Sequence, residues 1–208
     1  MPSQASLPFT ALSFLAAIVL ITTWHEFGHL LAAWRSRVPV KLIGIGLGPS
    51  LWGFPLSRRD ASQDGAIRLE VRAFPVGMAI GVVGRRTNDG QVRRPASRDL
   101  AVAAGGPVAS FMLGLLLSVL AIVVRAAPGL ESWLVATALM SLFLMALNLL
   151  PLPGLDGGHM LLLAAACRGW QLSPKGEASL HHVGMRLLVG ICLATTVAEL
   201  GLRLLNRG

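Results

Sequence analysis

The sequence predicts a mainly α-helical protein that crosses a membrane several times and carries a small β-sheet in its first long loop. Of the 208 residues, 54% are hydrophobic and only 13% are charged, about half the charged share that is usual in soluble domains. Residues 2–24, 101–124 and 132–155 contain no charged side chain. About 20 apolar residues in helical form span the hydrocarbon core of a bilayer. These stretches therefore predict transmembrane helices at about residues 8–34, 100–124 and 132–150.

A fourth span is predicted at residues 185–205, where the apolar pattern is weaker. Glu199 and Arg203 interrupt it, so a helix lying on the membrane surface is the alternative. The chain shows neither repeats nor a linker long enough to separate two domains. We therefore expect residues 1–208 to form a single membrane-embedded domain.

The positive charge is concentrated between the first two predicted spans, and this distribution predicts the orientation. Residues 35–98 account for the whole net charge of +8. A basic patch can indicate nucleic-acid binding, but basic loops between membrane helices usually remain in the cytoplasm. We expect a multi-pass protein of the cell membrane with its N-terminus outside, the loop 35–98 in the cytoplasm and no nucleic-acid partner.

The long loop, residues 38–98, has the pattern of a β-sheet. Residues 41–48 alternate apolar side chains with glycine, residues 67–74 alternate apolar with polar side chains, and 79–84 is a third candidate strand. Period-two alternation indicates strands with one buried face. Residues 57–65 are predicted to form a turn between these strands. We expect the sheet to rest against the cytoplasmic face of the membrane; a flexible basic loop is the alternative. Because glycines leave the backbone of 41–48 uncovered, we also hypothesise that this strand pairs with another extended chain.

The sequence HEFGH, residues 25–29, lies at the end of the first predicted span. His25 and His29 share one face of a helix, and two imidazoles at this spacing can bind one zinc ion. Glu26 lies about 100° around the helix, where it can act as a general base beside the metal. Ionisable groups inside a membrane are costly and usually functional. A structural cluster of Glu26 with a histidine, and a proton or ion pathway, are the alternatives.

A catalytic zinc site needs three protein ligands. Asp156 is the preferred third ligand, because it ends the uncharged stretch 132–155. His25 precedes the first following base, Arg35, by ten residues, or about 15 Å of helix. Asp156 precedes Arg168 by twelve residues, or about 18 Å, so both groups are expected at similar depth. His159 is the rival ligand, or a hydrogen-bonding partner outside the ligand set.

The stretch from 132 to 167 is too long for one straight span, so a break is expected within it. Pro151, Pro153 and Gly154 supply that break, after which the helix continues to 167. Broken backbone at membrane depth is tolerated beside a cavity or within protein. An active site that contains water provides such a cavity.

HEFGH together with NLLPLPGLDGGH, residues 148–159, resembles the site-2 protease family of intramembrane zinc metalloproteases. Residues 103–110, AAGGPVAS, look like the Gly-Pro motif of this family, with Ser110 where the family often has Asn. Residues 74–78, FPVGM, look like the family's strand beside the active site. The short connection between the second and third spans leaves no room for the PDZ domain of some relatives. We expect no appended CBS domain either, so the resemblance is to the compact form of the family.

The resemblance implies a protease that cleaves transmembrane segments of single-span membrane proteins within the lipid bilayer. It implies one Zn²⁺ per chain, held by His25, His29 and Asp156, with Glu26 as the base. Asn148 matches an asparagine of the family that contacts substrate, and its amide could also stabilise an oxyanion; capping of the broken helix is the alternative. A metal-binding, transporter-like protein and a catalytically silent protein that binds a membrane partner are the alternative functions.

Overall fold

The computed structural model describes residues 6–56, 67–85, 91–124, 128–170 and 172–205. The predicted turn at 57–65 lies outside these ranges. The described chain forms helices and two long strands in the following order: α1 (Ser6–Arg35), β1 (Val40–Pro55), β2 (Arg68–Val82), α2 (Ala96–Val123), α3 (Pro128–Asn148), α4 (Asp156–Cys167) and α5 (Pro174–Leu205). The predicted class, a mainly helical membrane protein with a small sheet in its first loop, is confirmed.

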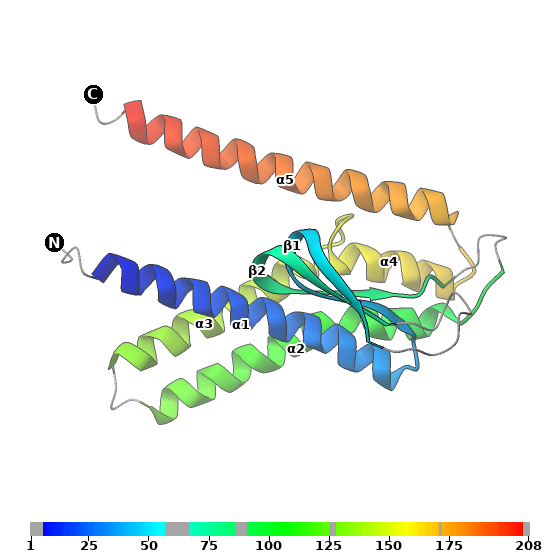
Figure 1. The fold of residues 1–208 in the computed structure, drawn as a ribbon, viewed down its shortest axis with the longest axis horizontal. Coiled ribbons are helices and arrows are strands. Elements are labelled where there is room, and N and C mark those ends of the chain that lie inside the picture. Colours follow the sequence, from blue (N-terminus) through cyan, green and yellow to red (C-terminus); the bar gives the residue numbers. More distant parts are fainter. Residues whose placement is uncertain (1–5, 57–66, 86–90, 125–127, 171, 206–208) are drawn as a thin grey trace.

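Four of the described helices are long and apolar enough to cross a membrane. The qualifying segments are Phe9–Arg35, Ala96–Val123, Gly129–Asn148 and Lys175–Glu199. The start of α1 and the end of α5 lie at the same end of the molecule (Figure 1), as expected for an even number of crossings. The chain is therefore a multi-pass membrane protein.

The fourth long helix begins eleven residues before the predicted start at 185. The Ser173 Oγ accepts a hydrogen bond of 3.1 Å from the backbone N–H of Gly176, and Pro174 occupies the first position of α5. Serine before the first turn and proline within it are both favoured at helix N-termini. The hydrophobic pattern missed this start because the first turns of α5 are polar.

The helices α1 and α2 pack backbone against backbone. A Cβ atom added at Gly28 would lie 2.3 Å from the carbonyl oxygen of Gly105, and one added at Gly105 would lie 2.5 Å from the oxygen of Gly28. Small residues allow membrane helices to approach this closely. Further along α2 a buried cluster joins it to α1 and α3, formed by Ile21, Leu113, Leu117, Ala121, Leu134 and Ala138.

The predicted helix break lies between α3 and α4. The helix α3 ends at Asn148, and α4 begins at Asp156. Within the connection Gly154 has a φ of 98°, a conformation that favours glycine. The chain therefore turns inside the protein and presents Asp156 at the start of a new helix.

The strands β1 and β2 form one antiparallel sheet with an irregular register. Ile43 lies opposite both Ile80 and Leu69, and Ile45 lies opposite both Met78 and Val71. The segment 42–45 is therefore flanked on both sides, so the prediction that 41–48 offers a free backbone is wrong for these residues. Alternation of side chains indicates the faces of a strand but not its neighbours. The third candidate strand, 79–84, is largely the end of β2.

The sheet also reaches below the expected membrane surface. A Cβ atom at Gly77, whose φ is 77°, would lie 3.0 Å from the Thr22 Oγ1. Thr22 precedes Arg35 by 13 positions (35 − 22), which is about 20 Å of helix. Non-helical backbone at that depth requires protein or a cavity around it, and here β2 lies against α1 (Figure 1).

Candidate metal centre and active site

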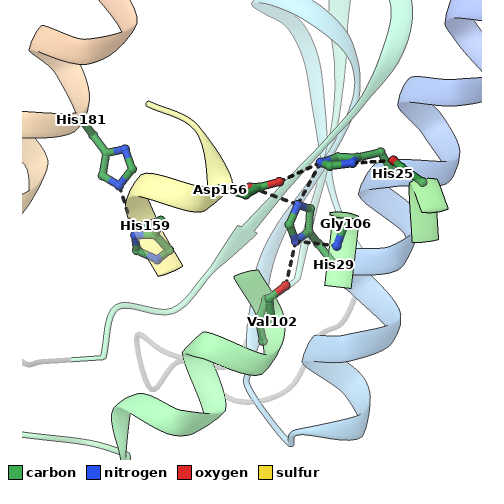
Figure 2. A network of polar contacts seen from close by, with 8 residues as sticks. His25, His29, Val102, Gly106, Asp156, His159 and His181 are labelled. Carbon is green, nitrogen blue, oxygen red and sulfur yellow. Dashed lines mark hydrogen bonds and ion pairs between the residues drawn. The ribbon is translucent and has the colours of Figure 1, made fainter. Parts of the chain in front are cut away.

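His25, His29 and Asp156 meet at the contact between α1 and α4. The Nε2 atoms of the two histidines lie 3.3 Å apart. The carboxylate of Asp156 places Oδ2 at 3.0 Å from Nε2 of His25 and Oδ1 at 3.4 Å from Nε2 of His29. Figure 2 shows the three side chains pointing toward one another, the two histidines from α1 and Asp156 from α4. Among the described residues, these three form a group whose donor atoms could hold one metal ion.

The opposite edge of each imidazole is held by α2. Nδ1 of His29 lies 2.7 Å from the carbonyl oxygen of Val102, and Nδ1 of His25 lies 2.9 Å from the Oγ of Ser110. A carbonyl oxygen only accepts, so Nδ1 of His29 carries the hydrogen and donates it. The backbone N–H of Gly106 also lies 3.3 Å from this nitrogen, but the nearer carbonyl decides the assignment. Nε2 of His29 therefore presents a lone pair toward Asp156.

The donor set fits a zinc ion. Oδ2 of Asp156 is buried and receives no hydrogen bond, although it lies 3.0 Å from Nε2 of His25. A buried acceptor without a donor is costly, and a cation bound between Asp156 and the Nε2 lone pair of His29 would satisfy it. Tetrahedral zinc with bonds of about 2.0–2.1 Å separates its ligand atoms by roughly 3.3 Å, close to the separations found here.

Gly106 leaves the space beside the two imidazoles open. A Cβ atom added there would lie 2.3 Å from Nε2 of His29 and 2.6 Å from Nε2 of His25. Any other residue at this position of α2 would thus press on both nitrogen atoms. The absence of a side chain at Gly106 is therefore part of the site's construction.

Glu26 and Asn148 line a cavity of about 250 Å³ together with His25 and Asp156. Glu26 is half-buried, and its carboxylate lies within hydrogen-bonding reach of the backbone of Ile80 in β2. Asn148 is the last residue of α3. The cavity thus combines a metal-binding set, a carboxylate outside that set and a side-chain amide, which together suit hydrolysis of a polarised carbonyl.

The sequence profile of peptidase family M50 matches residues 13–127 and 124–191. The chain belongs to peptidase family M50. This assignment, together with the zinc metalloproteases and the site-2 protease that the chain resembles, confirms the predicted relation to site-2 proteases.

Two of the similar proteins illustrate how much of the chain is shared. RasP of Oceanobacillus iheyensis, named a zinc metalloprotease, is 39% identical over 69 residues, which make up 33% of this chain and 16% of RasP. Rip1 of Mycolicibacterium smegmatis, also named a zinc metalloprotease, is 27% identical over 113 residues, or 50% of this chain and 27% of Rip1. This M50 chain therefore matches less than a third of the length of each relative.

The solved site-2 protease from Methanocaldococcus jannaschii resembles the chain in structure. The TM-score is 0.53 at 16% sequence identity, and the match covers 90% of this chain and 68% of the other. At this identity the likeness shows a shared fold.

The structure of this M50 chain also separates Asp156 from its rival ligand, His159. His159 points away from the centre, and its Nδ1 lies 3.1 Å from Nε2 of His181 in α5. Asp156 is therefore the third group that the fold brings to the two histidines.

Sequence reasoning left the role of Ser110 undecided and missed Val102. Both orient the imidazoles from α2, and Ser110 is fully buried. The Oγ of Ser141 in α3 donates a hydrogen bond of 2.8 Å to the carbonyl oxygen of Ser110. The AAGGPVAS motif indicated this region, but the contact between α1 and α2 was needed to pair each group with its histidine.

Proposed function

We propose that this M50 protein is an intramembrane zinc endopeptidase that cleaves transmembrane segments of single-span membrane proteins. The observation that carries the proposal is the convergence of His25, His29 and Asp156 beside a cavity that also holds Glu26. Glu26 and the two histidines belong to α1, a helix suited to a bilayer. We further propose that the chain is a single membrane-embedded domain that holds one zinc ion, with its N-terminus outside and the loop 35–98 in the cytoplasm.

The proposed mechanism assigns a separate task to each side chain. His25, His29 and Asp156 would hold the zinc ion, which when bound lowers the pKa of a water molecule and polarises a carbonyl group. Glu26 accepts the proton of the attacking water and passes it to the leaving amine. The Asn148 amide donates a hydrogen bond to the negative charge that develops on the carbonyl oxygen.

The substrate must present an open backbone to this cavity. A helical peptide keeps its carbonyl groups in internal hydrogen bonds, so the target segment has to unwind locally before hydrolysis. Residues that weaken a helix, such as glycine and proline, therefore favour cleavage when they lie near the scissile bond. Cleavage of membrane-tethered regulators, as in regulated intramembrane proteolysis, is the process that such a reaction would serve.

The test compares Glu26→Gln with Glu131→Gln, a control that removes a carboxylate at the start of α3. Each variant is purified in detergent, its zinc content is measured, and it is incubated with a tagged single-span substrate. We expect Glu26→Gln to retain zinc and lose at least about 100-fold in kcat, in line with the 10²–10⁴-fold contribution of general acid–base catalysis. The control should cleave at the wild-type rate. Equal cleavage by both variants would contradict the proposed enzyme and favour a metal-binding, transporter-like protein.

A further inference from the structure

The contacts between α5 and the rest of the described chain lie near its start, from Glu177 to Met185. Among the α5 residues whose burial the structure describes, Gly184 alone is buried. Its neighbours Val183 and Met185 are exposed. Over most of its length the helix runs apart from α1, α2 and α3 (Figure 1). Its position relative to the active site therefore depends on a small contact.

Gly184 lies directly against the loop that leads to Asp156. A Cβ atom added at Gly184 would lie 1.9 Å from the carbonyl oxygen of Pro153. A Cβ atom at Gly154 would in turn lie 3.0 Å from the backbone nitrogen of Met185. The backbones of α5 and of this loop thus meet two to three residues before Asp156.

His181, one turn before Gly184, connects the same loop to α4. The backbone N–H of Gly154 donates a hydrogen bond of 3.2 Å to Nδ1 of His181. This nitrogen accepts, so Nε2 of His181 carries the hydrogen and donates it over 3.1 Å to Nδ1 of His159. Figure 2 shows His181 reaching from α5 toward His159 on the helix that starts with Asp156. The contact therefore holds the chain on both sides of that carboxylate.

We propose that His181 and Gly184 form a docking point through which α5 holds the Asp156 loop where the carboxylate meets His25 and His29. His181 is then a positioning residue and not a ligand. The inference rests on the proposed metal site. Groups that orient ligands from outside the ligand set typically change metal affinity 10- to 100-fold when they are replaced. The small contact area makes this docking easy to disturb without unfolding the remaining helices.

The sharpest test compares Gly184→Ala with Gly190→Ala. Both changes replace glycine by alanine within α5, and both favour the helix by about 1 kcal/mol. Gly190 has no neighbouring atom within 4 Å of an added Cβ, so only the first change pushes α5 from the loop. We expect Gly184→Ala to weaken zinc binding by about 10-fold, the lower end of the range for orienting groups. Zinc affinity is measured on detergent-solubilised protein by competition with a chromogenic chelator. Equal affinities for the two variants would overturn the proposal.

The histidines give a second test. His181→Ala should weaken zinc binding by a similar factor, and His182→Ala, a change at its exposed neighbour, should not. His181→Asn offers an oxygen near the position of Nδ1 and should recover part of the loss. Equal zinc affinities for His181→Ala and His182→Ala would count against docking.

Ring-nitrogen NMR of metal-free protein with isotope-labelled histidine tests docking independently of zinc and of proteolysis. The wild type should show the Nε2–H tautomer for His181, and Gly184→Ala should lose this signature while Gly190→Ala retains it. An unchanged His181 signature in Gly184→Ala would contradict docking even if no substrate were ever cleaved. Conversely, a wild type that binds zinc, shows these differences and cleaves no peptide would refute the protease proposal alone.

Discussion

Replacing Gly106 by alanine should weaken metal binding without destabilising the fold. The added Cβ would lie 2.3 Å from Nε2 of His29 and 2.6 Å from Nε2 of His25. Ordinary van der Waals contact begins near 3.4 Å, so one or both imidazoles must move by roughly 1 Å. Zinc–nitrogen bonds tolerate only a few tenths of an ångström. The two ligands therefore cannot keep their positions beside Asp156.

The expected loss of affinity is at least about 100-fold, or roughly 2.7 kcal/mol, because here the ligands themselves move and not only the groups that orient them. The opposite effect is expected on the helix, since alanine within a helix is favoured over glycine by about 1 kcal/mol. Metal-free Gly106→Ala should consequently unfold at a temperature close to that of the metal-free wild type.

The assay combines chelator competition with thermal unfolding at several zinc concentrations. At a free zinc concentration of 100 times its Kd, the wild type should gain about 2.7 kcal/mol of stability, and Gly106→Ala should gain almost none. Gly129→Ala, where an added Cβ meets no atom within 4 Å, serves as the control and should behave like the wild type. A folded Gly106→Ala protein that binds zinc within threefold of the wild type would refute the reasoning.

Two further predictions concern a hydroxyl that orients a histidine of the site and a buried ion pair that stabilises the fold. Ser110→Ala removes the partner of Nδ1 of His25 and should weaken zinc binding about 10-fold. The control Ser118→Ala removes a hydroxyl bonded within its own helix and should leave zinc affinity unchanged. The same chelator competition measures both variants, and equal affinities would contradict the role of Ser110. Arg94→Ala should destabilise the fold by about 3–5 kcal/mol, because it leaves the buried carboxylate of Asp99 unpaired. Thermal unfolding of this variant is compared with that of Arg98→Ala, a change at an exposed arginine. Equal stabilities of the two variants would contradict the role of the ion pair.

The residues of the proposed metal site were readable from the sequence because each depends on local geometry. His25 and His29 are four residues apart, which fixes them on one face of α1 whatever surrounds it. Counting helical rise from the nearest basic residues placed Asp156 at a depth similar to that of His25, and the 3.0 Å separation between the two side chains agrees with that count. The break around Gly154 followed from the conformational limits of proline and glycine.

The contacts that support these ligands depend on how separate elements pack, so the sequence did not show them. Ser110 meets His25 only because Gly28 and Gly105 let α1 and α2 approach closely. Nothing local to the sequence around His181 links it to Gly154, which lies 27 positions earlier. Ser173 and Pro174 did mark the start of α5, but a search for apolar residues does not detect a polar first turn.

Because β1 has strand neighbours on both sides at residues 42–45, we now place the hypothesised pairing with an extended substrate at the end of β2. Among the described residues, the segment 78–82 has a strand neighbour on one side only, and Ile80 contacts Glu26 through its backbone. Successive residues of a strand direct their amides to opposite sides, so the amide of Met78 faces the same free edge as that of Ile80.

Met78→Pro removes this amide, whereas Met78→Ala keeps it and removes most of the side chain. One lost hydrogen bond of about 0.5–1.5 kcal/mol should lower kcat/KM by roughly 2- to 12-fold in Met78→Pro relative to Met78→Ala, with zinc content unchanged in both. Proline at Ile45 does not test the idea, because Ile45 has strand neighbours on both sides and its replacement breaks the sheet. Equal cleavage by Met78→Pro and Met78→Ala would mean that the substrate is held in another way.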